Sequence, residues 1–414
     1  MTGHTLTATG ATRADLGLRP VDLHLVDQRV AGRVIPPPAD AVAEEERWAM
    51  VADEPLSLLR VLGPEGDDGA TAGRRAGERI RALVAAGRYH HHGPVLAVHE
   101  LVADHHRQRG LIAGIPLEDV RAGRVRAHEQ TRAHREEKLS AFLDAAGMDV
   151  SPVLLTHTLI PELDHLLDTV VTGPPDLAFE GWHGVRQRVW VVDDPDLQAR
   201  IRTAAAPIGL LTIVDGHHRV AAALRTADAA SAPDTLLAEL IPDRDLRIIG
   251  YDRRVELDHP DEADAIMAGL VELAEVRPLP AGVPPRPATR DQLLVGTARG
   301  WVSATLRDVP DRLPDRLPVA LLQHRVLAPL VGIADPRTDP RLKHVPGLGD
   351  LRALDASLHR GPAVAFVPPA VTVDELRSIA EAGEILPPKA TYMDPKPGPG
   401  VVLRLRDRPV GTDP

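Results

Sequence analysis

The residues best suited to chemistry lie in the stretch LLTIVDGHHRVAAALR (residues 210–225), where Asp-Gly-His-His-Arg separates an apolar run from an alanine-rich one. Gly216 permits a tight turn and lets the backbone approach a ligand closely. Arg219 offers a planar fork that matches two phosphoryl oxygens, and His217 or His218 can donate a further hydrogen bond. These residue types predict a turn that binds a phosphate group.

Asp215, at the start of this turn, has three alternative roles. Its carboxylate suits a Mg²⁺ ion or a metal-bound water, it can orient a histidine, and it can cap the following helix. Adjacent residues on a helix point about 100° apart, so His217 and His218 are not expected to ligate one metal ion together. The alternative to a phosphate site is a capping aspartate followed by two solvated histidines. His218 is also a candidate catalytic residue.

Lysine is scarce in this chain, and its placement is informative. Of 48 basic residues only four are lysines, and two of these, Lys389 and Lys396, fall in PPKATYMDPKP (residues 387–397). The favoured interpretation is a proline-stiffened loop that presents two compact ammonium groups to phosphate or carboxylate. The alternative is a proline-rich turn in which the lysines fall by chance.

A second candidate for chemistry is Glu129, within VRAHEQT (residues 125–131). Its carboxylate would serve either as a general base near bound phosphates or as one charge of a solvated, salt-bridged surface. The residue pattern alone favours the surface. The arginines that crowd this region are Arg121, Arg124, Arg126, Arg132 and Arg135.

The elements that must position these residues follow from hydrophobic patterning. Residues 210–214 are predicted as a buried strand and residues 220–225 as a helix. The DGHHR sequence then lies at a strand-to-helix turn, where α/β proteins bind anions. VLAVHELV (residues 95–102) and RGLIAGIPL (residues 109–117) are predicted as the two strands of a hairpin. Strands and helices alternate along the chain, which predicts a mixed α/β fold.

The domain organisation is predicted from length and proline content. At 414 residues the chain is long enough for two or three domains. The stretch RPLPAGVPPRP (residues 277–287) holds five prolines in eleven residues, which is typical of a linker. We therefore expect an N-terminal domain over residues 1–275, a linker over residues 276–290 and a smaller C-terminal α/β domain over residues 291–414.

Composition limits the classes of partner. The formal net charge of −11 argues against nucleic acid, because phosphate backbones require a basic protein face. The sequence has no cysteine, which excludes disulfides, thiolate chemistry and Cys-ligated zinc. The N-terminal MTGHTLTATGATRADLG lacks the pattern of a signal peptide, and no apolar stretch approaches 18 residues. We expect a cytoplasmic protein without membrane or nucleic-acid partners.

Four landmarks of the sequence resemble the family known as domain of unknown function 1015. They are HEQT, IVDGHHRVAAAL, DPRTDPRLKHVPG and LPPKATYMDPKP, which occur in the family's order over nearly the whole chain. Near the start, PPPADAV keeps Asp40 where the family has its aspartate but has Ala39 in place of the usual tyrosine. Met393 likewise replaces the usual phenylalanine. Retained phosphate-facing residues beside lost aromatic ones imply a changed substrate pocket.

The DGHHR turn of that family is similar to the phosphate-binding turn of the ParB and sulfiredoxin superfamily, which includes free-serine kinases. This resemblance implies a ParB/sulfiredoxin-like N-terminal domain that holds a nucleotide or pyrophosphate at a helix N-terminus. By itself it does not identify the group that receives the phosphate.

The expected function is that of a small-molecule kinase. It would transfer a phosphoryl group from a nucleotide, ATP or ADP, or from pyrophosphate, to the hydroxyl of free serine or a related metabolite. Residues 215–219 would hold the donor phosphates. Glu129 would act as the base, with Asp40 as its competitor, and Asp215 or Asp40 would hold Mg²⁺. The further phosphate-facing residues are Lys389, Lys396 and Arg253.

Two other classes of function stay open. A nucleotide-responsive binding or regulatory protein would bind its ligand without turnover, and a phosphatase would release inorganic phosphate from the same anion site. No helix-turn-helix with a basic face is recognisable in the sequence, which disfavours a regulator that binds DNA. The expected partner is a small molecule, and the oligomeric state stays open, with a homodimer as one alternative.

Overall fold

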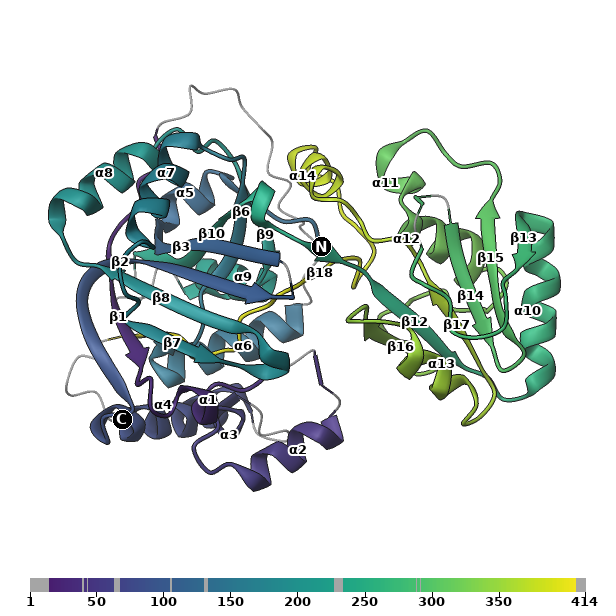
Figure 1. Cartoon of the computed structure of the whole chain (residues 1–414), viewed down its shortest axis with the longest axis horizontal. Helices are drawn as coiled ribbons and strands as arrows, with labels where there is room; N and C mark the ends of the chain where they lie inside the picture. The colour runs from purple at the N-terminus through teal and green to yellow at the C-terminus, as the bar shows by residue number, and fades with distance from the viewer. Residues whose placement is uncertain are drawn as a thin grey trace. The chain divides into compact units, whose positions relative to one another are not determined.

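Figure 1 shows the computed structural model of the chain, which describes residues 15–38, 41–42, 44–62, 68–104, 106–129, 133–226, 234–287, 289–290 and 292–406. The chain divides into two compact units. The first takes Met1–Ala127, Thr131–Leu246 and Pro395–Pro414, and the second takes His128–Gln130 and Arg247–Asp394.

In its described residues, the first unit contains a mixed sheet of eleven strands. Its strands are β1 (Val21–Val26), β2 (Tyr89–Ala103), β3 (His106–Pro116), β4 (Val125–Arg126), β5 (Met148–Asp149), β6 (Val153–His157), β7 (Leu177–Glu180), β8 (Arg186–Val192), β9 (Leu211–Asp215), β10 (Thr235–Pro242) and β19 (Val402–Leu405). The order is β4-β9-β6-β10-β3-β2-β1-β19-β5, and β8 pairs with β2 and β7. The antiparallel pairing of β2 with β3 confirms the predicted hairpin.

Both faces of this sheet are buried by helices. Along β2, Leu96 and Val98 belong to one hydrophobic core, and Val95 and Ala97 to the other, because successive side chains of a strand point to opposite faces. The helices that pack into the first core are α5 (Leu117–Arg121), α7 (Pro161–Val170), α8 (Pro195–Ala205) and α9 (His217–Thr226). Those that pack into the second are α1 (Ala31–Val34), α3 (Leu59–Leu62), α4 (Gly69–Ala85) and α6 (Ala133–Ala146). Helix α2 spans Glu44–Asp53.

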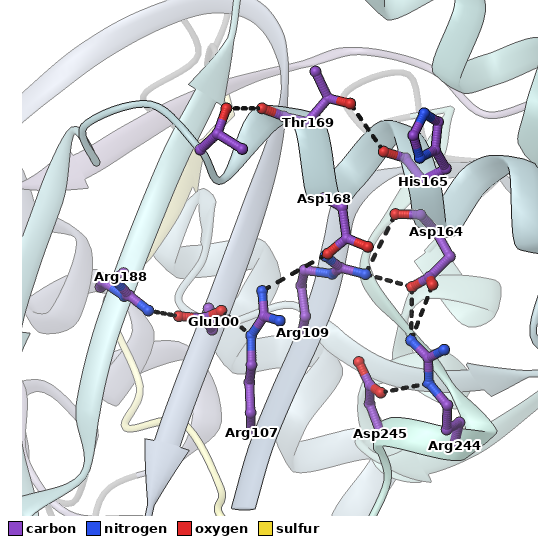
Figure 2. Close-up of polar contacts among 11 residues, drawn as sticks. Glu100, Arg107, Arg109, Asp164, His165, Asp168, Thr169, Arg188, Arg244 and Asp245 are labelled. Atoms are coloured by element: carbon purple, nitrogen blue, oxygen red, sulfur yellow. Dashed lines mark hydrogen bonds and ion pairs between the residues drawn. The ribbon is translucent and has the colours of Figure 1, made fainter.

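On the first of these faces, ion pairs tie the strands to α7 (Figure 2). Arg109 on β3 is 2% exposed and donates to Asp164 and Asp168 of α7. Glu100 on β2 is 1% exposed and accepts hydrogen bonds from two arginines on neighbouring strands. We call this group the Arg109 network, and it comprises Glu100, Arg107, Arg109, Asp164, Asp168, Arg188 and Arg244.

In its described residues, the second unit contains an antiparallel sheet. Its strands are β12 (Tyr251–Glu256), β13 (Ala274–Pro278), β14 (Gln292–Thr297), β15 (Gly300–Leu306), β16 (Leu342–Pro346) and β17 (Ala363–Val367), and a separate two-stranded ribbon consists of β11 (Ile248–Ile249) and β18 (Tyr392–Met393). The order of the sheet is β13-β15-β14-β17-β12-β16. Phe366 on β17 is fully buried in the core. The helices are α10 (Pro260–Leu273), α11 (Leu313–Arg316), α12 (Pro318–Leu321), α13 (Arg352–Leu358) and α14 (Val373–Glu381).

The boundaries between the two units differ from the domain boundaries expected from the sequence. The expected boundary at residue 275 falls within the second unit, and part of the expected linker is strand β13, which pairs with β15. The C-terminal segment returns to the first unit, where β19 pairs with β1 and β5. Backbone hydrogen bonds between distant strands account for both differences, because a proline-rich composition does not report them.

The mixed α/β class predicted from the sequence is confirmed. Parallel pairs, β4 with β9 and β6 with β10, occur beside antiparallel ones in the large sheet. Within the part of the chain that the structure describes, no helix combines the length and the apolar character needed to cross a membrane.

Candidate functional site

The predicted phosphate turn joins strand β9 to helix α9. Gly216 has φ +100°, a conformation that residues with a side chain rarely adopt, so this position favours glycine. The Gly216 carbonyl accepts a hydrogen bond from the amide of Arg219 at 2.8 Å. This bond starts the helix directly after the glycine, at His217, which is earlier than the sequence pattern predicted.

Asp215 is the centre of charge in this turn. Lys396 Nζ lies 2.8 Å from its Oδ1, and Arg219 Nη2 lies 2.6 Å from its Oδ2. The Nη1 atom of Arg219 also donates to the carbonyls of Ser151 at 3.0 Å and Pro152 at 2.5 Å. These contacts hold the guanidinium in one orientation and tie the turn to two segments that are distant in sequence.

The charges of this turn sum to a positive value. Burial opposes the ionisation of Asp215, but the charges of Lys396 and Arg219 outweigh it and hold the pKa of Asp215 well below its usual range. The carboxylate is therefore ionised at neutral pH, and the three side chains together carry one positive charge. Burial lowers the pKa of His217 to about 4, so this imidazole is neutral at pH 7. A positive cluster at a helix N-terminus suits an anion.

The turn opens on a cavity of about 320 Å³ in the first unit. Asp215, Arg219 and Lys396 lie on its wall, together with residues 397–402. This volume is at the lower end of the range for small-molecule sites in proteins. The cavity is therefore of a size for a small metabolite.

Strand register builds the floor of this cavity. Asp215 on β9 is paired with Leu154 on β6, and Leu154 is paired with Glu239 on β10. All three residues line the cavity. Because residues paired across neighbouring strands point to the same face, the register brings Asp215 and Glu239 to one face of the sheet.

A buried histidine and glutamate, which sequence reasoning missed, complete the floor. His99 Nδ1 lies 3.2 Å from Glu239 Oε2, and the two side chains are 2% and 1% exposed. Both residues line the cavity. The signal that could have revealed them is a single charged residue within the apolar strand sequence TLLAELI and a histidine within VLAVHELV.

The surroundings of Asp215 do not fit a Mg²⁺ ion. Both of its carboxylate oxygens are engaged by cations, Lys396 and Arg219. Among the described residues, no three His, Asp or Glu side chains are placed to hold a metal ion. Asp40, the other predicted metal ligand and the alternative base, lies outside the described residues. Asp215 is therefore not assigned as a metal ligand.

Two predicted phosphate ligands lie in the second unit. Arg253 is 2% exposed, and its Nη2 donates to the carbonyls of Lys389 at 2.8 Å and Pro388 at 3.3 Å. Burial lowers the pKa of Arg253 to about 10, which leaves it charged at neutral pH. Lys389 has φ +56°, and its Nζ lies 3.2 Å from the hydroxyl of Tyr251. Arg253 thus holds the loop that carries Lys389.

The first residues of the HEQT landmark, His128 and Glu129, also belong to the second unit. His128 Nε2 lies 3.1 Å from Thr391 Oγ1, and the His128 carbonyl accepts a hydrogen bond from the Leu386 amide at 2.8 Å. Glu129 is half-buried and follows this anchor directly. The predicted site residues therefore divide between the units, with Glu129, Arg253 and Lys389 in the second and Asp215, Gly216, His217, His218, Arg219 and Lys396 in the first.

Comparison with known proteins gives a family and several solved structures. A family model described as Protein of unknown function (DUF1015) matches residues 18–330. No curated protein gives a significant match. A free serine kinase in complex with AMP has a TM-score of 0.38 and 15% identity, covering 68% of this chain and 86% of that one. SbnI with a C-terminal truncation, from Staphylococcus aureus, has a TM-score of 0.41 and 12% identity, covering 71% and 87%. A conserved hypothetical protein from Pyrococcus furiosus has a TM-score of 0.36 and 15% identity, covering 68% and 90%.

Proposed function

This chain belongs to the family described as Protein of unknown function (DUF1015), and we propose that it is a phosphotransferase acting on a small hydroxylated substrate. A phosphoryl group would pass from a nucleotide or pyrophosphate to the hydroxyl of free serine or a related hydroxy metabolite. The observation that supports this proposal is the cavity at the β9–α9 turn, where Arg219 and Lys396 flank one carboxylate at the start of a helix.

The donor phosphates are assigned to the N-terminus of α9. The first amides of a helix have no intrahelical acceptor and point outward, which favours an anion there. Gly216 places no side chain beside these amides. Lys396 supplies a compact charge, and the guanidinium of Arg219 is already oriented by the carbonyls of Ser151 and Pro152. A bound phosphate would balance the positive charge of this cluster.

The remaining residues of the turn have supporting roles in this proposal. Phosphoryl transfer requires neutralisation of charge and alignment more than covalent chemistry from the protein. Asp215 aligns Lys396 and Arg219, since its ionised carboxylate accepts from both. His217 is neutral and can donate one hydrogen bond to a phosphoryl oxygen without adding charge. His218, in the same helical turn, is proposed as a second donor.

The base that takes the proton of the acceptor hydroxyl is assigned by resemblance alone. Glu129 is the proposed base, and Asp40 is the alternative. Glu129→Gln and Asp40→Asn are the two variants to compare. Replacement of the true base is expected to lower kcat strongly and to leave KM nearly unchanged.

The test of the proposed function is a search for product. Purified protein is incubated with Mg²⁺, with ATP, ADP or pyrophosphate, and with a panel of hydroxy amino acids, and products are identified by mass spectrometry. We expect one donor to yield a phosphorylated acceptor, and Arg219→Ala to lose donor binding. The matched control is Arg225→Ala on the same helix, whose side chain is 44% exposed. No donor consumption with any acceptor, together with unchanged donor binding by Arg219→Ala, rules the proposal out.

Two other results of this experiment identify the alternative classes. Nucleotide binding with a conformational change but no phosphorylated product indicates a regulatory protein. Release of inorganic phosphate from phosphoserine, without any acceptor, indicates a phosphatase.

A further inference from the structure

The cavity contains a second polar group that the proposed phosphate site does not use. His99 on β2 and Glu239 on β10 lie on its floor, with His99 Nδ1 3.2 Å from Glu239 Oε2. Among the described residues, neither His99 Nε2 nor Glu239 Oε1 has a hydrogen-bond partner. Each side chain thus binds the other through one polar atom and leaves its second polar atom for something else.

The contact between the two side chains links their protonation states. When Glu239 is ionised, its carboxylate only accepts hydrogen bonds, so the proton of the contact lies on Nδ1 of His99. An imidazole that is neutral and protonated at Nδ1 presents a lone pair at Nε2. With Glu239 ionised and His99 neutral, the His99–Glu239 dyad carries one negative charge and presents two acceptors, Nε2 and Oε1.

A neighbouring carboxylate shows how the protein pairs such a group when its role is structural. Glu100, the residue after His99 on β2, accepts hydrogen bonds from Arg107 and Arg188 on the opposite face of the sheet (Figure 2). In the part of the chain that the structure describes, Glu239 has no arginine or lysine within salt-bridge distance. A buried charge without a cation is unfavourable, so the dyad is suited to a cation that arrives with a ligand.

Gly110 allows the dyad to form. It lies on β3 between the two strands and is the register partner of His99. A Cβ at Gly110 would lie 2.5 Å from Glu239 Cγ and 2.6 Å from Glu239 Oε1. The absence of a side chain at this position lets the imidazole and the carboxylate meet over the intervening strand. The register of three strands therefore places the dyad.

We propose that His99 and Glu239 bind a primary ammonium group of the acceptor substrate. An ammonium group brings N–H donors and one positive charge, which match the negative charge of the dyad and its acceptor Oε1, while His99 holds the carboxylate through Oε2. Elsewhere on the wall of the same cavity, Asp215, Arg219 and Lys396 sum to one positive charge. A cavity that has a positive phosphate site and also a negative dyad fits an amino alcohol or a hydroxy amino acid better than a hydroxy acid without an amine. This inference rests on the proposed function and narrows its substrate class.

The test compares ligands with and without an amine on the full-length protein. Isothermal titration calorimetry is carried out with L-serine, ethanolamine, D-glycerate and pyrophosphate. D-glycerate keeps the hydroxyl and the carboxylate but lacks the amine, and ethanolamine lacks the carboxylate. We expect L-serine and ethanolamine to bind about tenfold more tightly than D-glycerate, the effect of one hydrogen-bonded charge. Glu239→Gln is expected to remove this preference and to leave pyrophosphate binding unchanged.

The matched control is Glu100→Gln, because Glu100 is an equally buried carboxylate of the same sheet, next to His99 on β2, and faces away from the cavity. It is expected to keep the preference for amines. Should Glu239→Gln fail to fold, Gly110→Ala, which places a methyl group against Glu239, and His99→Gln address the same question.

The inference is overturned if wild-type protein binds D-glycerate as tightly as L-serine, or if the folded variants of the dyad keep the preference. Failure of the proposed function has a different signature, in which neither pyrophosphate nor any nucleotide binds or is consumed. An amine preference that depends on Glu239 would support the subsite even then.

Discussion

Two buried polar groups occupy opposite faces of strands β2 and β3. In the Arg109 network, the charge of each buried side chain is balanced by protein side chains (Figure 2). In the His99–Glu239 dyad, Nε2 and Oε1 have no partner among the described residues. His99 and Glu100 are neighbours in the sequence, and the pleat of the strand sends them to different faces. Guanidinium groups thus engage both oxygens of Glu100, whereas Glu239 keeps one oxygen without a protein partner among the described residues.

The largest expected effect comes from breaking the paired face. Arg109→Ala leaves Asp164 and Asp168 without a buried cation, and we expect it to lower the free energy of unfolding by about 3 kcal/mol. Asp168 is 53% exposed, which places the cost at the lower end for such pairs. Urea unfolding measures the loss, and pyrophosphate binding by the folded variant should be unchanged. A variant that keeps its stability but loses binding would reverse the assignment of the two faces.

A smaller effect is expected at the cavity face. Lys396→Ala removes one of the two cations at Asp215, and we expect pyrophosphate affinity to fall about tenfold, the value of one charge-assisted hydrogen bond. Calorimetric titration measures it. Lys343→Ala, which removes an exposed lysine on β16, is the control and should bind as wild type does. Equal affinities for Lys396→Ala and wild type would exclude Lys396 from the phosphate site.

The pH dependence of stability tests the burial of His217. Its folded-state pKa, about 4, is below its ordinary value of 6.5, so the unfolded chain binds more protons between these two values. Above pH 6.5 the imidazole is neutral in both the folded and the unfolded chain, so its burial does not reduce the free energy of unfolding. As the pH falls from 6.5 toward 4, only the unfolded chain takes up the proton, and the free energy of unfolding decreases. From pH 7 to 5.5 we expect a loss of about 1 kcal/mol that His217→Gln does not show. Urea unfolding at several pH values measures it, and parallel curves for the two proteins would contradict the prediction.

The smallest effect on the free energy of unfolding is expected from an exposed ion pair, which serves as the reference value for the buried groups on both faces of the sheet. Arg225 lies 3.5 Å from Glu136 and 3.4 Å from Glu137, and its side chain is 44% exposed. Arg225→Ala should change the free energy of unfolding by less than about 1 kcal/mol. Thermal unfolding at low and high salt measures it, and a larger loss would mean that exposure is a poor guide to these pairs.

The sequence by itself determined the local elements of the site and the family. An apolar run, a glycine and an alanine-rich run were sufficient to predict a strand, a turn and a helix around Gly216, because φ preference and hydrophobic period are local properties. The hairpin of β2 and β3 was predicted for the same reason. The family resemblance rested on short landmarks, and the match over residues 18–330 confirms it.

Only the tertiary structure decided which distant residues meet. His99 and Glu239 are 140 positions apart and are joined by the order of β2, β3 and β10 and by the missing side chain of Gly110. Lys389 and Lys396, predicted as one loop, belong to different units, because the chain returns to the first sheet through β19. Strand order and register depend on hydrogen bonds between remote segments, and a local pattern of residue types does not specify them.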